Sequence, residues 1–473
     1  MLILNEARPE MNYIHALQKI VGENYVITDS EEKYIYEQDN TGNLRFPCDC
    51  VVKPASSQEI SAILQMCSEY ALQVTVRGGG TGVTGGALPL YGGIVLSLER
   101  FNRILEIDTT NSWALVESGV VTQKLSDAAK DRGLYYPIVP GSGGSCLIGG
   151  NISTGAGSHR SARYGTIRDY VINLEVVLPT GEIMWTGANT TKNSSGFNLT
   201  QLFVGSEGTL GVITRALLKL VPFPSHEIVL LSAFDSTKKA VSAIEDIAMA
   251  GISPSSVELI CEDALWHTAE YLKYDFPLLD LKTKAHLLVE LDGYEHHELM
   301  SRAEKSTTII EQHTDQEILV GDTAESKKKL WQLRECIGEA MTQNGLQYRD
   351  VDICVPRSQL LNYLEGVQNI CRQHDLRTAS FGHAWDGNLH TMILLSDEES
   401  IFPNEKVDKA LEEIHHFGGE LGGVISGEHG IGFLQRDLFR MLSSERKMEL
   451  VRGIKKLFDP AGIINKDKIF TTI

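Results

Sequence analysis

Arg77-Gly-Gly-Gly-Thr-Gly-Val-Thr-Gly-Gly-Ala87 is the most informative stretch of this 473-residue chain, and it directly follows the short apolar segment 72–76. Glycine at this density costs folding entropy, so it is expected where the backbone needs positive φ or where a ligand approaches the amides. Amide groups of such a turn can donate to phosphate oxygens, and Arg77 adds positive charge beside them. The stretch therefore predicts a loop that holds the diphosphate of a large ligand.

The same loop contains a G-x-G-x-x-G match, which is the dinucleotide fingerprint of the doubly wound nucleotide-binding fold. That fingerprint requires a helix to start at its glycines, whereas this loop continues through further glycines and Pro89, which disfavour a helix interior. We therefore reject a doubly wound fold. A Gly-rich surface turn would be the simplest interpretation of an isolated match, but two more glycine segments, residues 140–157 and 203–214, favour a ligand site.

The composition is that of a globular protein of two or more domains, with 42% hydrophobic and 22% charged residues. A formal net charge of −19 argues against a nucleic-acid partner, which would require a basic face. No apolar run approaches the roughly 20 residues of a membrane span, and Glu6 and Glu10 stand where a signal peptide would be apolar. We therefore expect a cytoplasmic protein without a membrane span. The scattered cysteines lack any C-x-x-C spacing, which predicts buried free thiols and no iron–sulfur cluster.

The order of segments predicts four regions. Residues 1–47 form an expected helical lead-in. The glycine segments fall within residues 48–224, where Ser56-x-x-Glu59 is a capping box that predicts a helix before the Arg77 loop. After Pro224 amphipathic helices alternate with strands, which predicts a second domain over residues 225–425 and a C-terminal segment, 426–473, that returns to the ligand site.

Four motifs follow one another along the chain: the Arg77 loop, Ile148-Gly-Gly-Asn151, Arg163-Tyr-Gly-Thr-Ile-Arg-Asp-Tyr170 and Val204-Gly-Ser-Glu-Gly-Thr-Leu-Gly211. Together they resemble the FAD-binding domain of the vanillyl-alcohol oxidase and p-cresol methylhydroxylase (PCMH) superfamily. The resemblance implies an α+β fold, in which a two-subdomain PCMH-type FAD-binding domain is followed by an α+β substrate (cap) domain with an antiparallel sheet. Some members attach the flavin to a histidine just after the glycines; Thr81 stands at that position, so we predict non-covalent FAD.

The resemblance also implies which residues contact FAD, with its diphosphate on the Arg77 loop. The expected cofactor-binding residues are Arg77, Gly78, Gly79, Gly80, Thr81, Gly82, Gly85, Pro140, Gly149, Gly150, Asn151, Glu207, Ile213 and Asn465.

A second constellation lies in Phe381-Gly-His-Ala-Trp-Asp-Gly-Asn-Leu-His390 and Ser426-Gly-Glu-His-Gly-Ile-Gly432. Asp386-Gly387 is a hairpin signal, so His383 and His390 can fold back toward each other, and Glu428 can approach as an oxygen ligand. Two imidazoles and a carboxylate leave an open coordination position, which is typical of a catalytic divalent metal. For any one of these histidines a hydrogen-bonded core or turn residue is the simpler interpretation, and we interpret the neighbouring pair His415-His416 as a helix surface.

With both constellations, the chain from about Cys48 onward resembles the FAD-dependent D-2-hydroxyacid dehydrogenase family. That family includes D-lactate and D-2-hydroxyglutarate dehydrogenases and the flavin subunit of glycolate oxidase. The resemblance implies that His383, His390 and Glu428 bind zinc or a similar ion such as manganese, and that His429 is the base. It further implies that Arg334 grips the substrate carboxylate, although alone this arginine would be interpreted as a surface salt bridge. The expected reaction is oxidation of the hydroxyacid to a 2-oxoacid with hydride transfer to flavin N5.

Three departures from the family pattern concern Trp385, Met392 and Lys466-Asp467. An indole and a thioether beside the metal site should make the pocket smaller or less polar, which disfavours a dicarboxylate and favours a small substrate such as D-lactate. Glycolate and D-2-hydroxyglutarate stay possible substrates. Arg349 is a candidate for a second anion contact.

Two alternatives stay open. One is an enzyme like the flavin-dependent ether-lipid synthase, and the other is a non-catalytic electron-transfer flavoprotein subunit. The sequence leaves open whether electrons pass to an electron-transfer flavoprotein, an iron–sulfur subunit, quinone or oxygen, and whether the chain forms a homodimer.

Overall fold

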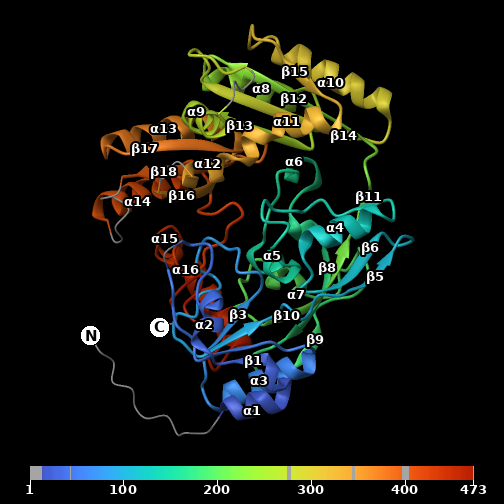
Figure 1. Cartoon of the computed structure of the whole chain (residues 1–473), viewed down its shortest axis with the longest axis vertical. Helices are drawn as coiled ribbons and strands as arrows, with labels where there is room; N and C mark the ends of the chain where they lie inside the picture. Colours follow the sequence, from blue (N-terminus) through green and yellow to red (C-terminus); the bar gives the residue numbers. More distant parts are fainter. Residues whose placement is uncertain (1–12, 43, 274–277, 344–346, 397–403, 472–473) are drawn as a thin grey trace.

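The computed structural model describes residues 13–42, 44–273, 278–343, 347–396 and 404–471. It forms two bodies, one above the other in Figure 1. The lower body contains the N-terminal half of the chain and the C-terminal helices α15 (Arg436–Met441) and α16 (Glu445–Phe458). The upper body contains the residues between these two parts and is organised around one large sheet.

The first sheet of the lower body leads into the glycine loop. Its strands lie in the order β1 (Val26–Ile27), β2 (Cys50–Val52), β4 (Ile94–Ser97) and β3 (Val74–Arg77). Strands β2, β4 and β3 are parallel, whereas β1 is antiparallel to β2. No helix occurs between residues 78 and 93, all of which the structure describes, so the rejection of a doubly wound fingerprint is confirmed.

Helices α1 (Tyr13–Val21) and α3 (Ser57–Glu69) pack into the core of this sheet through apolar residues such as Leu17, Ile60 and Leu64. The predicted start of α3 is confirmed, because Ser56 Oγ accepts a hydrogen bond from the Glu59 amide at 3.2 Å. The Glu59 carboxylate accepts from the Ala55 amide at 2.8 Å rather than from that of Ser56, so the capping box is only half formed. The short helix α2 (Ser30–Lys33) lies between them in the chain. The N-terminal helices therefore pack against the sheet that leads into the glycine loop.

The second sheet is antiparallel, in the order β5 (Ile104–Asp108), β6 (Trp113–Glu117), β10 (Val212–Lys219), β8 (Val171–Val177) and β9 (Ile183–Trp185). Its helices are α4 (Thr122–Lys130), α5 (Ile148–Thr154), α6 (Ser161–Tyr164) and α7 (Leu199–Phe203). Strands β7 (Leu134–Tyr135) and β11 (Val221–Pro222) form a separate pair. Val177 and Val212 share a core with the first sheet, so the two sheets pack together.

The sheet of the upper body has seven antiparallel strands. Their order is β15 (Leu319–Gly321), β12 (His226–Phe234), β14 (Ala285–Gly293), β13 (Ser256–Cys261), β17 (Arg377–His383), β18 (Asn388–Leu395) and β16 (Gln347–Cys354). One face packs against α8 (Thr237–Met249), α10 (His296–Ile310), α13 (Leu360–Gln373) and α14 (Glu405–Glu420). The other packs against α9 (Glu262–Leu272), α11 (Ala324–Glu335) and α12 (Ile337–Gln343). The predicted α+β fold with an antiparallel cap sheet is confirmed.

The C-terminal segment is held to the lower body by polar contacts. Asn465 Oδ1 accepts a hydrogen bond from the Val76 amide at 2.8 Å, and its Nδ2 donates to the Glu207 carbonyl at 2.7 Å. Buried Lys455 donates to the Thr209 carbonyl at 2.7 Å. Residues of β3, of the 204–211 motif and of the C-terminus are therefore fixed to one another beside the glycine loop.

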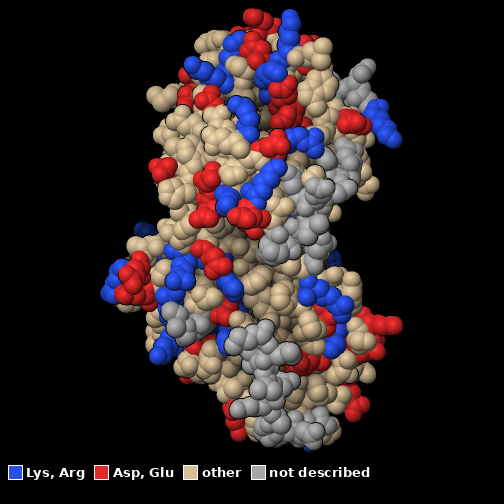
Figure 2. Space-filling model, turned by 90° about the vertical axis from the view of Figure 1, so that its left-hand side faces the viewer, with Lys and Arg blue, Asp and Glu red and all other residues tan. Residues whose placement is uncertain are grey.

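One interpretation of the histidines is wrong. His415 is buried at 4% exposure, because it falls on the same face of α14 as Val407 and Ile414, while His416 is exposed. All eight cysteines are free thiols, and Cys336 and Cys354 are only half-buried. Within the described residues, no helix is long and apolar enough to cross a bilayer. Figure 2 shows acidic and basic side chains interspersed on one side of the molecule, which narrows between its two bodies.

Candidate active site

A cavity of about 1010 Å³ lies between the two bodies. Its lower wall is formed by the three glycine segments, and its upper wall by α11 and by strands of the seven-stranded sheet. This volume is at the top of the range of ligand sites, roughly 300–1,000 Å³, and suits a large cofactor together with a small substrate.

The lower wall consists mainly of backbone. Gly79, Gly82, Gly141 and Gly150 all line the cavity. A Cβ built on Gly79 would lie 2.5 Å from the Ser145 carbonyl oxygen, whereas one on Gly82, Gly141 or Gly150 meets no atom within 4 Å. The glycines therefore leave an open cradle beside main-chain amides that side chains would fill, and this cradle fits an extended dinucleotide such as FAD.

The predicted cofactor residues line this cavity, with two exceptions among those that the structure describes there. Arg77 is buried and its guanidinium turns away, donating to the Gln38 carbonyl at 2.7 Å and the Ile35 carbonyl at 2.9 Å. The carbonyl of Gly85 accepts a hydrogen bond from Lys468 instead. Arg77 and Gly85 therefore do not line the cavity in this arrangement, and their hydrogen bonds hold the loop on the side away from it.

Glu207 joins the lower wall to the segment that carries His429. Its carboxylate accepts hydrogen bonds from the amides of Ile431 and Gly432, both at 2.7 Å. Burial raises the pKa of Glu207 to about 7, although the two amides and Lys468 oppose that shift. Glu207 therefore acts as a tie between the 204–211 motif and the 426–432 loop.

The upper wall consists of side chains from the predicted hairpin. Strands β17 and β18 pair so that Phe381 lies opposite His390 and His383 lies opposite Asn388. Glu428 Oε1 lies 3.5 Å from His383 Nε2 and 3.3 Å from His390 Nε2. The hairpin prediction is confirmed. The turn brings His383 and His390 together, and Glu428 joins them from the 426–432 loop. The donor atoms of the three side chains all lie within 4.8 Å of one another, which suits a divalent metal ion.

Carboxylates behind these side chains set their charge. Glu258 Oε1 lies 2.5 Å from His383 Nδ1. Burial alone would lower the pKa of His383, but Glu258 and Glu428 raise it to about 10. Burial would likewise raise the pKa of Glu428, but its hydrogen bonds with His383 and His390 hold it well below the ordinary value. The negative charge gathered here would favour a cation as ligand.

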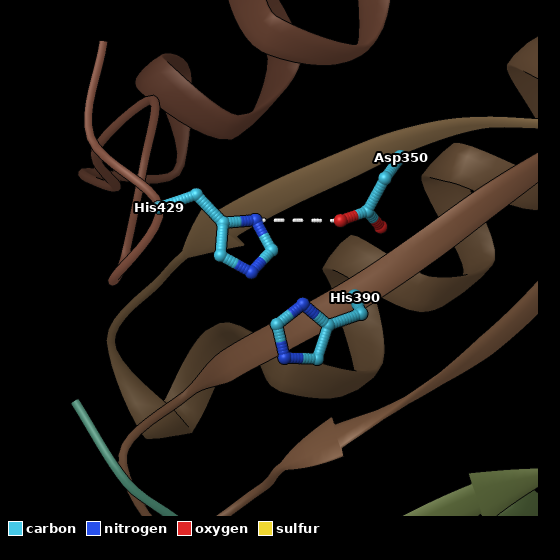
Figure 3. Close-up of side chains that lie close together, drawn as sticks. All are labelled: Asp350, His390 and His429. Atoms are coloured by element: carbon cyan, nitrogen blue, oxygen red, sulfur yellow. Dashed lines mark ion pairs between the residues drawn. The ribbon is translucent and has the colours of Figure 1, made fainter. Parts of the chain in front are cut away.

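His429 stands next to this group, stacked on His390 with ring centroids 5.2 Å apart. Figure 3 shows Asp350 and His429 facing each other beside His390, with His429 Nδ1 3.3 Å from Asp350 Oδ2. Asp352 accepts hydrogen bonds from the amides of Glu428 at 2.9 Å and His429 at 2.8 Å. Burial would lower the pKa of His429, but Asp352 and Asp350 raise it to about 9. Asp350, His390 and His429 also form a group that could hold a metal.

Arg334 is half-buried at the cavity rather than on the open surface. Its Nε donates to Glu258 Oε2 at 2.6 Å, and its guanidinium lies 4.7 Å from the centre of the Phe381 ring. Burial would raise the pKa of Glu258, but His383 and Arg334 lower it to about 2. One carboxylate thus connects Arg334 to His383, and both residues line the cavity.

Two expectations about the pocket are wrong. Trp385 packs against the core on the far face of the sheet, beneath the guanidinium of Arg357 at 4.2 Å, and is not among the described residues that line the cavity. Arg349 lies opposite Ile393 on that far face, whereas its neighbour Asp350 faces the cavity. Met392 does line the cavity, as expected.

Sequence reasoning missed four residues of this region: Glu258, Asp350, Asp352 and His159. Asp350 and Asp352 are two residues apart on β16, so both point to the cavity side of the sheet. The two-residue period of a strand would have identified them once that side was known. Glu258 and His159 lie in segments without a local signal of function.

Comparison with known proteins identifies the two parts of the chain. Residues 47–187 match the family described as "FAD binding domain", and residues 223–469 match "FAD linked oxidases, C-terminal domain". The glycolate oxidase subunit GlcD of Bacillus subtilis is 36% identical over 93% of this chain and 92% of its own length. The D-lactate dehydrogenase of Anaerostipes hadrus is 33% identical over 98% of each chain. The lower body therefore binds FAD, as predicted.

Two solved structures have the same fold. p-Cresol methylhydroxylase with bound substrate matches with a TM-score of 0.77 and 17% identity over 98% of this chain and 97% of its own. An alkyldihydroxyacetonephosphate synthase matches with a TM-score of 0.74 and 17% identity over 98% of this chain and 87% of its own. These likenesses confirm the predicted PCMH-type fold.

Proposed function

The chain belongs to the family of FAD-linked oxidases, and from this we propose that it oxidises a small D-2-hydroxyacid, with D-lactate favoured, to the 2-oxoacid at a divalent metal ion. The observation that carries the proposal is the convergence of His383, His390 and Glu428 beside His429, in the same cavity as the glycine cradle. The names of the two relatives, which concern D-lactate and glycolate, support this substrate class.

The charges around the cavity support a metal. Among the described lining residues, the acidic side chains are Glu207, Glu227, Glu290, Glu335, Asp350 and Glu428, and the basic ones are Arg160, Lys327, Lys328 and Arg334. Of these, Glu428 and Asp350 lie beside His383, His390 and His429, and a divalent cation bound among them would attract the anion of a hydroxyacid. When bound to His383, His390 and Glu428, zinc or manganese would supply a Lewis acid that makes the 2-hydroxyl more acidic.

The proton is handled by His429 in this proposal. Asp350 and Asp352 lie on the Nδ1 side of its ring, at 3.3 Å and 3.6 Å, so they favour the tautomer with the proton on Nδ1. Once Nε2 has lost its own proton, either above the pKa of about 9 or when a nearby cation lowers that pKa, it can accept the proton of the 2-hydroxyl. The amides that hold the loop to Asp352 keep the ring in place.

Substrate orientation is assigned to Arg334, whose guanidinium would bind the carboxylate. Phe381 and Met392, both buried, contribute an apolar surface beside it, which suits the methyl group of lactate better than a second carboxylate. FAD, when bound, supplies the two-electron acceptor for the hydrogen that leaves C2. The electrons then pass to a partner flavoprotein, an iron–sulfur subunit or quinone.

The test is the visible flavin spectrum of the purified protein under anaerobic conditions. D-lactate, L-lactate, glycolate and D-2-hydroxyglutarate are added separately, before and after chelation of metal. We expect D-lactate to bleach the flavin, chelation to abolish the bleaching, and zinc or manganese to restore it. The proposal fails if none of these acids reduces the flavin of metal-loaded protein.

Glycolate is the second candidate substrate, because the glycolate oxidase subunit is similar over nearly the whole chain. It lacks the methyl group that Met392 and Phe381 would contact. A higher rate of bleaching by glycolate than by D-lactate would favour it. An ether-lipid synthase activity rests on the fold alone, and it predicts no net reduction of flavin by a hydroxyacid.

A further inference from the structure

We propose that His159 is a substrate-binding residue, which donates a hydrogen bond from Nδ1 to the carboxylate of the hydroxyacid alongside Arg334. The proposal rests on the function proposed above and adds a specificity-determining contact from the FAD-binding domain. His159 precedes α6 and lines the cavity together with Arg334, His383 and Trp331.

The position of His159 is fixed from the opposite body. Trp331 of α11 packs against its ring, with centroids 5.0 Å apart at an interplanar angle of 62°. The Trp331 indole is itself anchored, because Nε1 donates to Glu290 Oε2 at 3.1 Å. Arg334 follows Trp331 by three residues on α11, which places both on the same side of the helix. His159 therefore stands beside the residue expected to bind the carboxylate.

The tautomer of His159 follows from its hydrogen bond. Arg160 Nε lies 3.2 Å from His159 Nε2, and an arginine can only donate, so Nε2 must be the acceptor. The proton of the neutral ring is then on Nδ1, for which no partner occurs among the described residues. Burial lowers the pKa of His159 to about 3, and Arg160 adds to that shift. Because Nε2 accepts from Arg160, the ring acts as a neutral donor through Nδ1.

A neutral donor is useful here because the neighbouring cations are already compensated. Arg334 is paired with Glu258 through Nε at 2.6 Å. Arg160 is paired with Glu227 at 2.5 Å and with Glu290 at 3.2 Å. A carboxylate can accept several hydrogen bonds, and the terminal nitrogens of Arg334 cover only some of its directions. The Nδ1 proton of His159 would supply a further donor at no cost in charge.

Two variants separate this role from a structural one. His159→Asn places an amide nitrogen near the position of Nδ1 and loses the acceptor for Arg160, whereas His159→Gln reaches Arg160 and loses the donor near Nδ1. Steady-state oxidation of D-lactate gives KM and kcat. Binding of oxalate, a non-oxidisable two-carbon analogue, is followed through the flavin spectrum of the resting holoenzyme. Flavin absorbance confirms that each variant has folded, and His159→Met replaces the Gln variant if it does not retain flavin.

We expect His159→Gln to raise the KM for D-lactate and the Kd for oxalate by about 10- to 100-fold, with kcat nearly unchanged, because a hydrogen bond to a charged group is lost in ground state and transition state alike. His159→Asn should stay within about threefold of the wild type in both constants. The reverse order would assign His159 to holding Arg160, and equal behaviour of both variants to the wild type would remove it from the substrate site. If no hydroxyacid reduces the wild-type flavin, the proposed function itself fails and this contact fails with it.

Discussion

The lower wall of the cavity is made of backbone around Gly79, Gly82 and Gly150, whereas the upper wall is made of side chains, among them His383, His390 and Arg334. The glycines matter because they have no side chain: a Cβ at these positions would fill the cradle or clash with a neighbouring segment of the backbone. The upper residues act through the atoms they present, and each is held by a carboxylate or a paired strand. A substitution in the lower wall should therefore affect cofactor binding and stability, and one in the upper wall should affect catalysis.

The largest effect that tests this contrast is expected at His429. His429→Asn removes the group that accepts the proton, and turnover should fall by on the order of 10²- to 10⁴-fold. Flavin and metal content should stay at wild-type levels, because neither the glycines nor His383, His390 and Glu428 are altered. Anaerobic flavin reduction and metal analysis measure both. Near-normal turnover in this variant would remove His429 from the mechanism.

A matched pair of glycines in α5 tests the lower wall. A Cβ on Gly149 would lie 2.6 Å from Ser118 Cβ, so Gly149→Ala should lower the free energy of unfolding by about 1–3 kcal/mol. Gly150→Ala meets no atom within 4 Å, and alanine favours a helix, so flavin-free protein should be as stable as the wild type.

The same Gly150→Ala variant should nevertheless bind FAD about tenfold or more weakly, because its methyl group projects into the cavity. Thermal unfolding of deflavinated protein and titration with FAD separate the two effects. Unchanged FAD affinity would place the cofactor away from α5.

The contact between the 204–211 motif and the 426–432 loop, made by Glu207, can be tested by varying pH. The pKa of Glu207 is about 7 in the folded protein against 4.5 as the ordinary value, so the folded state retains a proton that the unfolded chain releases. The protonated carboxyl of Glu207 therefore stabilises the folded state fully below pH 4.5. The free energy of unfolding should fall by about 1–3 kcal/mol as pH rises from 4.5 to 7. Burial lowers the pKa of Lys468 to about 7. This group therefore changes the free energy of unfolding only above pH 7, where it raises the stability as pH increases.

Urea unfolding at several pH values between 4.5 and 7 should therefore show wild-type stability declining relative to Glu207→Gln. Parallel profiles of the two proteins would mean that Glu207 is ionised throughout and that its two amide donors outweigh burial.

The smallest effect is expected at Trp385. Trp385→Phe should leave the KM for D-lactate within about twofold, because the indole packs on the face of the sheet away from the cavity. Met392→Ala is the matched comparison: it enlarges the cavity beside Phe381 and should raise the KM for D-lactate several-fold while improving that for a longer hydroxyacid. A large effect of Trp385→Phe on KM would contradict this placement.

Local sequence patterns predicted those features whose residues lie close together in the chain. The Arg77 loop predicted a diphosphate site because glycine density is itself the signal, and Asp386-Gly387 predicted the turn that brings His383 and His390 together. Both depend on backbone conformations that a few neighbouring residues determine. The same patterns could not predict where the Arg77 side chain points, because its guanidinium donates to carbonyls that lie 39 and 42 residues earlier in the chain.

What the sequence by itself determined is the FAD-binding fold, the hairpin and the identity of the side chains that could bind a metal. Only the tertiary structure decided that Trp385 and Arg349 face away from the cavity, that Glu258 connects Arg334 to His383, and that His159 joins the upper residues from the lower body. The physical reason is that burial and pairing between distant segments follow from how sheets and helices pack, and no local period along the chain encodes which faces meet.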